Sequence, residues 1–270
     1  MTDITLGQFV PGQSCIHRLD PRTKILLMLA YIAMVFLVNT MTMFLMPLIY
    51  VGVTLLLARI PLSYMHKAIK PIRLLMVFMF VLNLFVTPGK ELIWQWWILK
   101  ITRESLRQAV FITLRLVFLI TGTSLMTLTT SPIALTDGLE KLLSPLKALK
   151  FPAHELAMMM TIALRFIPTL MEEADKIRKA QMARGADFES GNLIERAKAM
   201  LPILIPLFVS AFRRADELAM AMESRCYHGG EGRTRMHQLR FGRNDLWAGL
   251  TTVVAIALVP LLQHLIPQLL

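Results

Sequence analysis

Residues 109–128 read AVFITLRLVFLITGTSLMTL, a run of twenty residues in which Arg115 is the single charge. A helix needs about 20 predominantly apolar residues to cross the hydrocarbon core of a bilayer. This run therefore predicts a transmembrane helix, and the stretches on both sides of it repeat the pattern.

Four further apolar runs flank this one: Ile25–Val38, Met43–Ala58, Leu74–Val86 and Leu246–Leu262. Several are short for a membrane span, but flanking residues or a locally thinned bilayer make up the difference. Hydrophobic residues form 55% of the chain and charged residues 17%, whereas a soluble domain carries about 25% charged residues. This composition excludes a disordered chain and predicts an all-α, polytopic membrane protein with about five transmembrane helices.

The formal net charge is +11. In a soluble protein this would suggest nucleic acid, but the cytoplasmic loops of membrane proteins also collect Lys and Arg, so no nucleic-acid partner is expected. Basic residues precede the first run and fill the 59–73 loop, while the tail after Leu262 has none. This distribution predicts a cytoplasmic N-terminus and an external C-terminus.

The 87–108 loop fits this orientation less well. It should be external, yet it carries four basic and two acidic residues. Its tryptophans, Trp94, Trp96 and Trp97, are typical of a membrane–water interface, although ordinary core aromatics are the alternative.

Between the fourth and fifth runs lies a long segment that holds 17 of the 29 basic residues. The chain is therefore divided into N-terminal membrane helices (1–128), a cytoplasmic segment (129–245) and a C-terminal membrane helix (246–270). Within the segment, good helix formers predict long helices over Leu156–Ala183 and Leu193–Cys226. Pro168, Pro202 and Pro206 should bend them where apolar sequence gives way to charged sequence.

The two long helices carry a repeat of period 41. Ala174-Asp175 lies ten residues before Arg184, and Ala215-Asp216 lies ten residues before Arg225. Each Arg has small neighbours, which are Ala183 and Gly185 in the first copy and Ser224 and Cys226 in the second. An Arg at a helix C-terminus is favoured by the helix dipole alone. Small neighbours add room for a partner surface to approach the rigid guanidinium fork.

Several of these stretches resemble the transmembrane T component of energy-coupling factor (ECF) transporters. They are Ala163-Leu164-Arg165-Phe166-Ile167-Pro168, Ala180-Gln181-Met182-Ala183-Arg184-Gly185, Arg214-Ala215-Asp216-Glu217 and Glu223-Ser224-Arg225-Cys226-Tyr227. The start of the first apolar helix, Leu19-Asp20-Pro21-Arg22-Thr23-Lys24, is similar to the N-terminal signature of the same family. The resemblance covers nearly the whole chain.

The resemblance implies a subunit of a prokaryotic cell-membrane ABC importer for vitamins or transition-metal ions. The T component of this family joins two cytoplasmic ATPases to one membrane-embedded, substrate-binding S component. Two long coupling helices end in Arg motifs, each of which inserts into one ATPase. By this resemblance Ala183, Arg184, Gly185, Ser224, Arg225 and Cys226 form the ATPase-coupling site. The second motif departs from the family, because Ser and Cys replace Ala and Gly, and a left-handed helix end is less easy for Cys226 than for Gly.

Other chemical signals are missing from the sequence. It contains no P-loop motif, so ATP is expected on the partner subunits. Its six histidines are dispersed along the chain, so neither a metal nor a cofactor is expected in this chain. No catalytic set is visible, so the chain is not expected to be an enzyme. Arg115 is left open between a functional site, a snorkelling side chain and a partner contact. A self-contained secondary transporter or channel remains the alternative function, and the substrate cannot be read from these residues.

Overall fold

The computed structural model describes residues 9–89, 91–96, 99–149, 151–188, 190, 192–229 and 238–265. The chain divides into two compact units. We call Met1–Gly138 with Gln238–Leu270 the bundle unit, and Leu139–His237 the arm unit.

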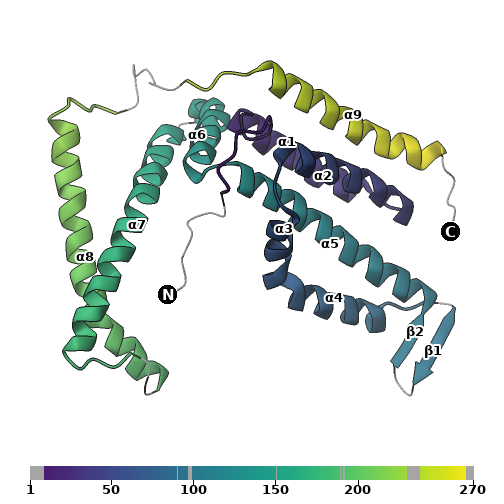
Figure 1. Cartoon of the computed structure of the whole chain (residues 1–270), viewed down its shortest axis with the longest axis horizontal. Coiled ribbons are helices and arrows are strands. Elements are labelled where there is room, and N and C mark those ends of the chain that lie inside the picture. Colours follow the sequence, from purple (N-terminus) through teal and green to yellow (C-terminus); the bar gives the residue numbers. More distant parts are fainter. Residues whose placement is uncertain are drawn as a thin grey trace. The chain divides into compact units, whose positions relative to one another are not determined.

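The bundle unit is built from helices (Figure 1). They are α1 (Pro21–Leu37), α2 (Leu45–Ala58), α3 (Leu62–Ile69), α4 (Arg73–Val86), α5 (Arg103–Thr129), α6 (Pro132–Leu143), which continues into the arm unit, and α9 (Arg243–Leu265). Short 3-10 helices at Met41–Phe44 and Lys70–Ile72 lead into α2 and α4. α1 starts where the sequence provides an N-cap: the Asp20 side chain accepts a hydrogen bond from the Arg22 amide, and Pro21 occupies the first turn.

Four helical stretches of the described residues are long and apolar enough to cross a membrane: Met41–Ala58, Leu62–Val86, Arg103–Thr129 and Arg243–Gln263. They contain four of the five predicted runs. The remaining run, Ile25–Val38, lies in α1 except for its last residue, and α1 at 17 residues is shorter than these four stretches. The predicted all-α, polytopic architecture is confirmed.

α1 nevertheless runs along α9 from end to end. At one end the Asp20 amide donates to Asp245 Oδ1 at 2.8 Å. At the other end Gln263 Nε2 donates to the Leu37 carbonyl at 2.9 Å. Two contacts separated by nearly the whole length of both helices show that α1 and α9 are parallel and cover the same depth of the bundle.

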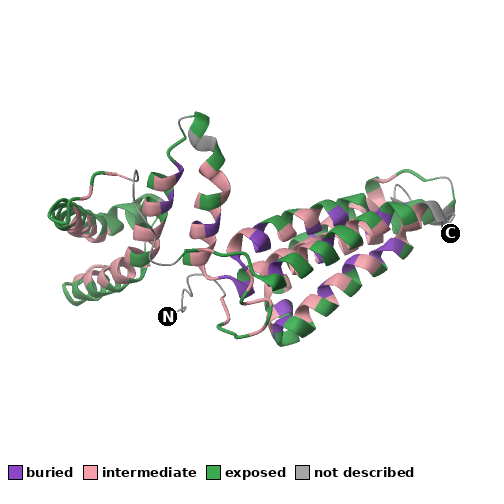
Figure 2. Cartoon of the chain, turned by 90° about the horizontal axis from the view of Figure 1, so that it is seen from above, coloured by how far each residue is buried: buried purple, intermediate pink, exposed green. Residues whose placement is uncertain are grey.

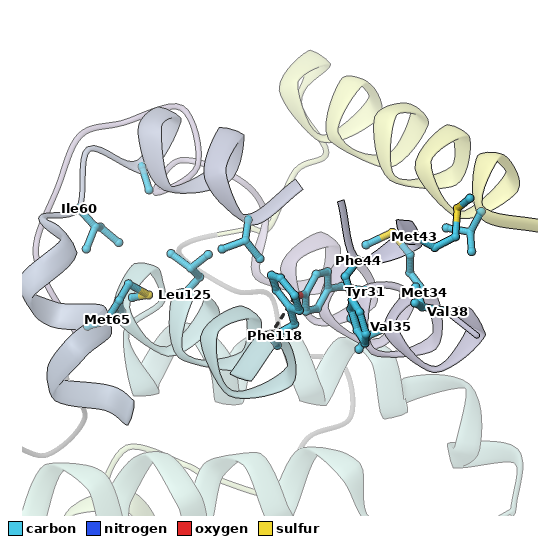
Figure 3. Packing of buried hydrophobic residues seen from close by; sticks show 14 residues of the cluster. Tyr31, Met34, Val35, Val38, Met43, Phe44, Ile60, Met65, Phe118 and Leu125 are labelled. Atoms are coloured by element: carbon cyan, nitrogen blue, oxygen red, sulfur yellow. Dashed lines mark hydrogen bonds between the residues drawn. The ribbon is translucent and has the colours of Figure 1, made fainter. Parts of the chain in front are cut away.

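The core of the bundle unit lies where α1, α2 and α5 meet (Figure 3). Tyr31 stacks on Tyr50 with 5.3 Å between the ring centroids, and its hydroxyl donates to the Phe118 carbonyl at 2.9 Å. A side chain at Gly122 would overlap the Tyr31 ring, so glycine is what lets α5 approach α1 here. The neighbouring Met34 and Val35 are fully buried.

Arg115, the charge within the α5 run, has a contact inside the bundle. Its Nη2 donates to the carbonyl of Val38, the C-cap of α1, at 2.6 Å. The guanidinium also lies 4.7 Å from the centroid of the Phe111 ring. The side chain thus satisfies a carbonyl that the end of α1 leaves without a helical partner.

The 87–108 loop forms an antiparallel hairpin, a departure from the otherwise helical chain. β1 (Leu92–Trp96) pairs with β2 (Leu99–Thr102), and Trp94 lies opposite Ile101. Aromatic and β-branched residues favour strands, which explains why part of a segment expected as a loop forms strands. Trp97 lies outside the described residues, and the interfacial position of the tryptophans stays a prediction.

The arm unit consists of two long helices that follow the 3-10 helix η3 (Ser144–Leu149). α7 (Ala153–Ala183) and α8 (Leu193–Glu223) each run through 31 residues. Both predicted arms are therefore present, and each continues through its prolines as one helix. Among the described residues of this unit only Ala153 and Ala157 are buried, in contrast to the bundle (Figure 2).

Candidate functional site

The two predicted Arg motifs lie where the arm helices end. α7 ends at Ala183, and Arg184 is its C-cap. α8 ends at Glu223, so Ser224 and Arg225 lie in the turn that follows the helix. The predicted boundary at Cys226 had placed both residues inside the helix. The structure thus places both motifs at helix C-termini, as the repeat predicts.

The first motif closes α7 with a Schellman-type turn. The Ala186 amide donates to the Gln181 carbonyl at 3.0 Å, and the Gly185 amide donates to the Met182 carbonyl at 3.0 Å. Gly185 has φ +86°. This left-handed conformation is the reason for glycine at the position, since it reverses the chain and lets the last carbonyls be satisfied.

The second motif closes α8 in the same way, 41 residues later. The Tyr227 amide donates to the Met222 carbonyl at 3.0 Å, and the Cys226 amide donates to the Glu223 carbonyl at 2.8 Å. Cys226 has φ 55°, so it takes the left-handed conformation that the sequence indicated would be less easy for it. The two helix ends therefore share their backbone geometry although their small residues differ.

All six predicted site residues are exposed: Ala183, Arg184, Gly185, Ser224, Arg225 and Cys226. Within the part of the chain that the structure describes, neither Arg184 nor Arg225 has an acidic partner. Each guanidinium keeps its donors, and the left-handed turn beside it presents no large side chain. The geometry suits insertion into a groove lined by carboxylates or carbonyls, where an Arg fork makes paired hydrogen bonds.

α8 also presents an apolar face. Ile205 is 61% exposed, Phe208 63% and Phe212 68%. Spacings of three and four residues place these side chains on one face of the helix, and Leu201 extends it by a further turn. An exposed apolar face on a helix with no buried residue among those described indicates a partner or lipid. The sequence showed the apolar middle of this helix but not which side of it would be uncovered.

The bundle unit contains a cavity of about 520 Å³ between α1, α2, α5 and α9. Its lining is mostly apolar, and several of its polar groups are bonded within the protein. The Tyr50 hydroxyl lies 3.1 Å from Thr252 Oγ1, and Lys24 Nζ donates to the Thr129 carbonyl at 2.8 Å. Polar substrates need several convergent polar groups, so the cavity fits an apolar ligand better. No cluster of three or more potential metal ligands occurs among the described residues.

Sequence reasoning missed the polar contacts that join the ends of the bundle helices. Asp20 could have been found, because Asp followed by Pro at a helix start is a capping signal. Its partner Asp245 could not, since 225 residues separate the two. The pairing of Arg115 with Val38 depends in the same way on the packing of α1 against α5.

Comparisons with known proteins identify relatives over nearly the whole chain. The family model described as cobalt transport protein (CbiQ) matches residues 12–237. The energy-coupling factor transporter transmembrane protein EcfT of Acidaminococcus fermentans is 55% identical over 267 residues, 99% of each chain. The proteins of the same name from Thermosediminibacter oceani and Bacillus subtilis are 58% and 51% identical, over 93% and 97% of this chain and 95% and 96% of their own.

Proposed function

The chain belongs to the EcfT/CbiQ family, the transmembrane components of energy-coupling factor transporters, and we propose that it couples two cytoplasmic ATPases to a substrate-binding S component. In this role the chain transmits motion and catalyses no reaction. ATP is bound by the partner subunits, and this chain needs no cofactor.

The observation that carries the proposal is the matched pair of arm ends. Arg184 and Arg225 are exposed, 41 residues apart, and each precedes a residue with positive φ. Two equivalent surfaces on one chain fit two equivalent partners, as two ATPase subunits would be. Arg184 serves one ATPase and Arg225 the other, with Ala183, Gly185, Ser224 and Cys226 allowing close approach of the backbone.

The apolar face of α8 supports the second half of the proposal. A membrane-embedded S component offers apolar surface, and Ile205, Phe208 and Phe212 would be covered by it. The arm unit has little core of its own, so its long helices depend on such contacts for a fixed position. Substrate recognition then belongs to the S component, with vitamins or transition-metal ions as the substrate classes.

The proposed location is the cell membrane of a prokaryote, with the N-terminus in the cytoplasm. The start of α1 and the start of α9 lie at the same end of the bundle, where Asp20 meets Asp245. The loop-charge rule requires this pairing, since it places the residues before both helices on the cytoplasmic side. Arms that follow α5 and precede α9 then face the ATPases.

Charge reversal at the two arm ends tests the proposal. The full complex is co-expressed, captured through a tag on this chain, and the ATPase yield is measured. We expect Arg184→Glu and Arg225→Glu each to lower the yield, and the double variant to lower it further. Arg184→Lys and Arg225→Lys should fall between, because Lys keeps the charge but loses the planar fork.

Arg213→Glu is the matched control, since it reverses an exposed Arg on α8 away from the helix end. It should retain the ATPases in full. If the double variant at Arg184 and Arg225 retains them as well, the assignment of the coupling site is wrong. ATP hydrolysis by the purified chain alone would refute the non-catalytic role.

A further inference from the structure

The half-buried stripe of α8 has an equivalent stripe on α7, although α7 half-buries a second stripe as well, whose equivalents on α8 are exposed. Each half-buried residue of this stripe on α8 has a half-buried counterpart on α7, 41 residues earlier in the chain. The pairs are Ile162 and Ile203, Phe166 and Leu207, Thr169 and Ser210, Leu170 and Ala211, Glu173 and Arg214, Ile177 and Leu218, and Gln181 and Met222. Two helices that pack through the same face of a repeated unit are related by a local twofold axis.

One contact locates this axis. Arg214 Nη2 lies 2.9 Å from Glu173 Oε2, and the two residues are 41 positions apart, which is the repeat period. In a twofold arrangement a residue touches its own counterpart only on the axis, because all other positions are displaced to opposite sides. Figure 1 shows α7 and α8 crossing within the arm unit.

The sequence departs from the repeat where the axis passes. The copies agree at Ala174-Asp175 and Ala215-Asp216, but Glu172-Glu173 in the first copy is replaced by Arg213-Arg214 in the second. A faithful repeat would bring two like charges together on the axis, and they would repel. Opposite charges at this position turn the self-contact into an ion pair.

We propose that Glu173 and Arg214 are positioning residues that fix the crossing of the two arms and hold Arg184 and Arg225 at equal distances from it. Each motif Arg lies 11 residues beyond its member of the pair, and 11 residues of helix are about 16 Å long. This inference deepens the proposed function, because equal reach matters only if the two ends engage two equivalent partners.

A second donor fixes the carboxylate. Hydrogen bonding from the Ser210 hydroxyl, together with that from Arg214, lowers the pKa of Glu173, although burial opposes the shift. Ser210 and Arg214 are one helical turn apart on α8, so they hold Glu173 at two points. The pair remains partly exposed, with 36% of the Arg214 side chain and 26% of the Glu173 side chain accessible. Such pairs add little to stability, so their removal should change the crossing and leave the fold intact.

Distance measurements in the full chain test the inference. Spin labels are placed at position 182 and at its repeat equivalent, position 223, in a variant with Cys15→Ser and Cys226→Gly, reconstituted in lipid nanodiscs. Glu173→Arg or Arg214→Glu alone should broaden the distance distribution and shift its mean. The charge swap that combines both changes should restore the narrow distribution.

The neighbouring pair provides matched controls. Glu172 and Arg213 occupy the adjacent repeat position and carry the same charges, but both are exposed. Glu172→Arg and Arg213→Glu should leave the distribution unchanged. In the assembled complex, uptake into liposomes should fall roughly threefold or more in each single variant at Glu173 or Arg214, and the swap should recover it.

Several outcomes would overturn the inference: single variants with the parent distribution, controls that broaden it equally, or a swap that fails to restore it. Glu173→Gln and Arg214→Gln remove one charge of the pair without introducing repulsion, and they should also broaden the distance distribution. They replace the charge-reversed variants if a reversed charge prevents folding. The distance readout needs no ATPase. It therefore tests whether Glu173 and Arg214 fix the crossing of the arms, even if Arg184 and Arg225 prove not to bind ATPases.

Discussion

The backbone amide of Asp20 donates a hydrogen bond to Asp245 Oδ1 at 2.8 Å, although 225 residues separate them. The other carboxylate oxygen of Asp245 accepts from the Gly242 amide at 2.7 Å. One buried side chain thus caps the start of α9 and ties it to the start of α1. Every residue of the arm unit lies between Asp20 and Asp245 along the chain, so the Asp245 carboxylate fixes where the chain returns to the bundle.

Asp245→Ala should destabilise the bundle by about 1.5–3 kcal/mol, because it leaves two backbone amides without their charged acceptor. Asp245→Asn keeps one acceptor oxygen and should cost less. Unfolding of the purified protein in detergent measures both variants. An Ala variant as stable as the parent would mean that water replaces the carboxylate.

Arg115→Met should also destabilise the bundle, by about 1–3 kcal/mol, since the Val38 carbonyl loses its donor inside the apolar core. Arg115→Lys should recover part of the loss. Arg107→Met, at an exposed position of the same helix, is the control and should be nearly neutral. If Arg115→Met is neutral as well and transport alone is lost, Arg115 has a functional role instead.

Cys226→Gly should stabilise the end of α8. A non-glycine residue in the left-handed region costs about 1–2 kcal/mol, and the greater freedom of glycine in the unfolded chain offsets about 0.4–1 kcal/mol of that. A net gain of up to about 1.6 kcal/mol should slow amide hydrogen exchange at residues 224–227. Gly185→Ala should speed exchange at the end of α7; nothing lies within 4 Å of the added methyl group, so the cost is purely conformational. Faster exchange in Cys226→Gly would contradict the argument.

His17 should titrate below its ordinary value near 6.5. Burial lowers its pKa, and the charge of Lys24 lowers it further, against a hydrogen bond to the Val10 carbonyl that raises it. Because the folded protein binds this proton less readily than the unfolded chain, the stability that His17 contributes is complete above pH 6.5 and is lost as the pH falls through the folded pKa. NMR titration of the imidazole signals, with His17→Gln to assign the resonance, measures the shift. A midpoint at or above 6.5 would refute it.

Features whose signals are local could be predicted from the amino-acid sequence alone. Apolar runs predicted the spans although several runs are short, and helix-forming residues predicted the arms to within three residues at each end. The 41-residue repeat placed Arg184 and Arg225 at equivalent helix ends. The family resemblance indicated that a left-handed helix end would be less easy for Cys226 than for Gly, and Cys226 takes positive φ as Gly185 does.

Which residues meet across long stretches of the chain became clear only from the folded structure. In the sequence Arg115 is an unexplained charge within a membrane helix. Helix packing lets it donate a hydrogen bond to the carbonyl of Val38, 77 positions away. In the sequence Glu173 and Arg214 are two charged residues on separate helices. The crossing of these helices brings the opposite charges together as an ion pair. Helix signals arise from residues three or four apart and can be read along the chain. Pairing between helices depends on which faces come together in space, and no local pattern specifies that.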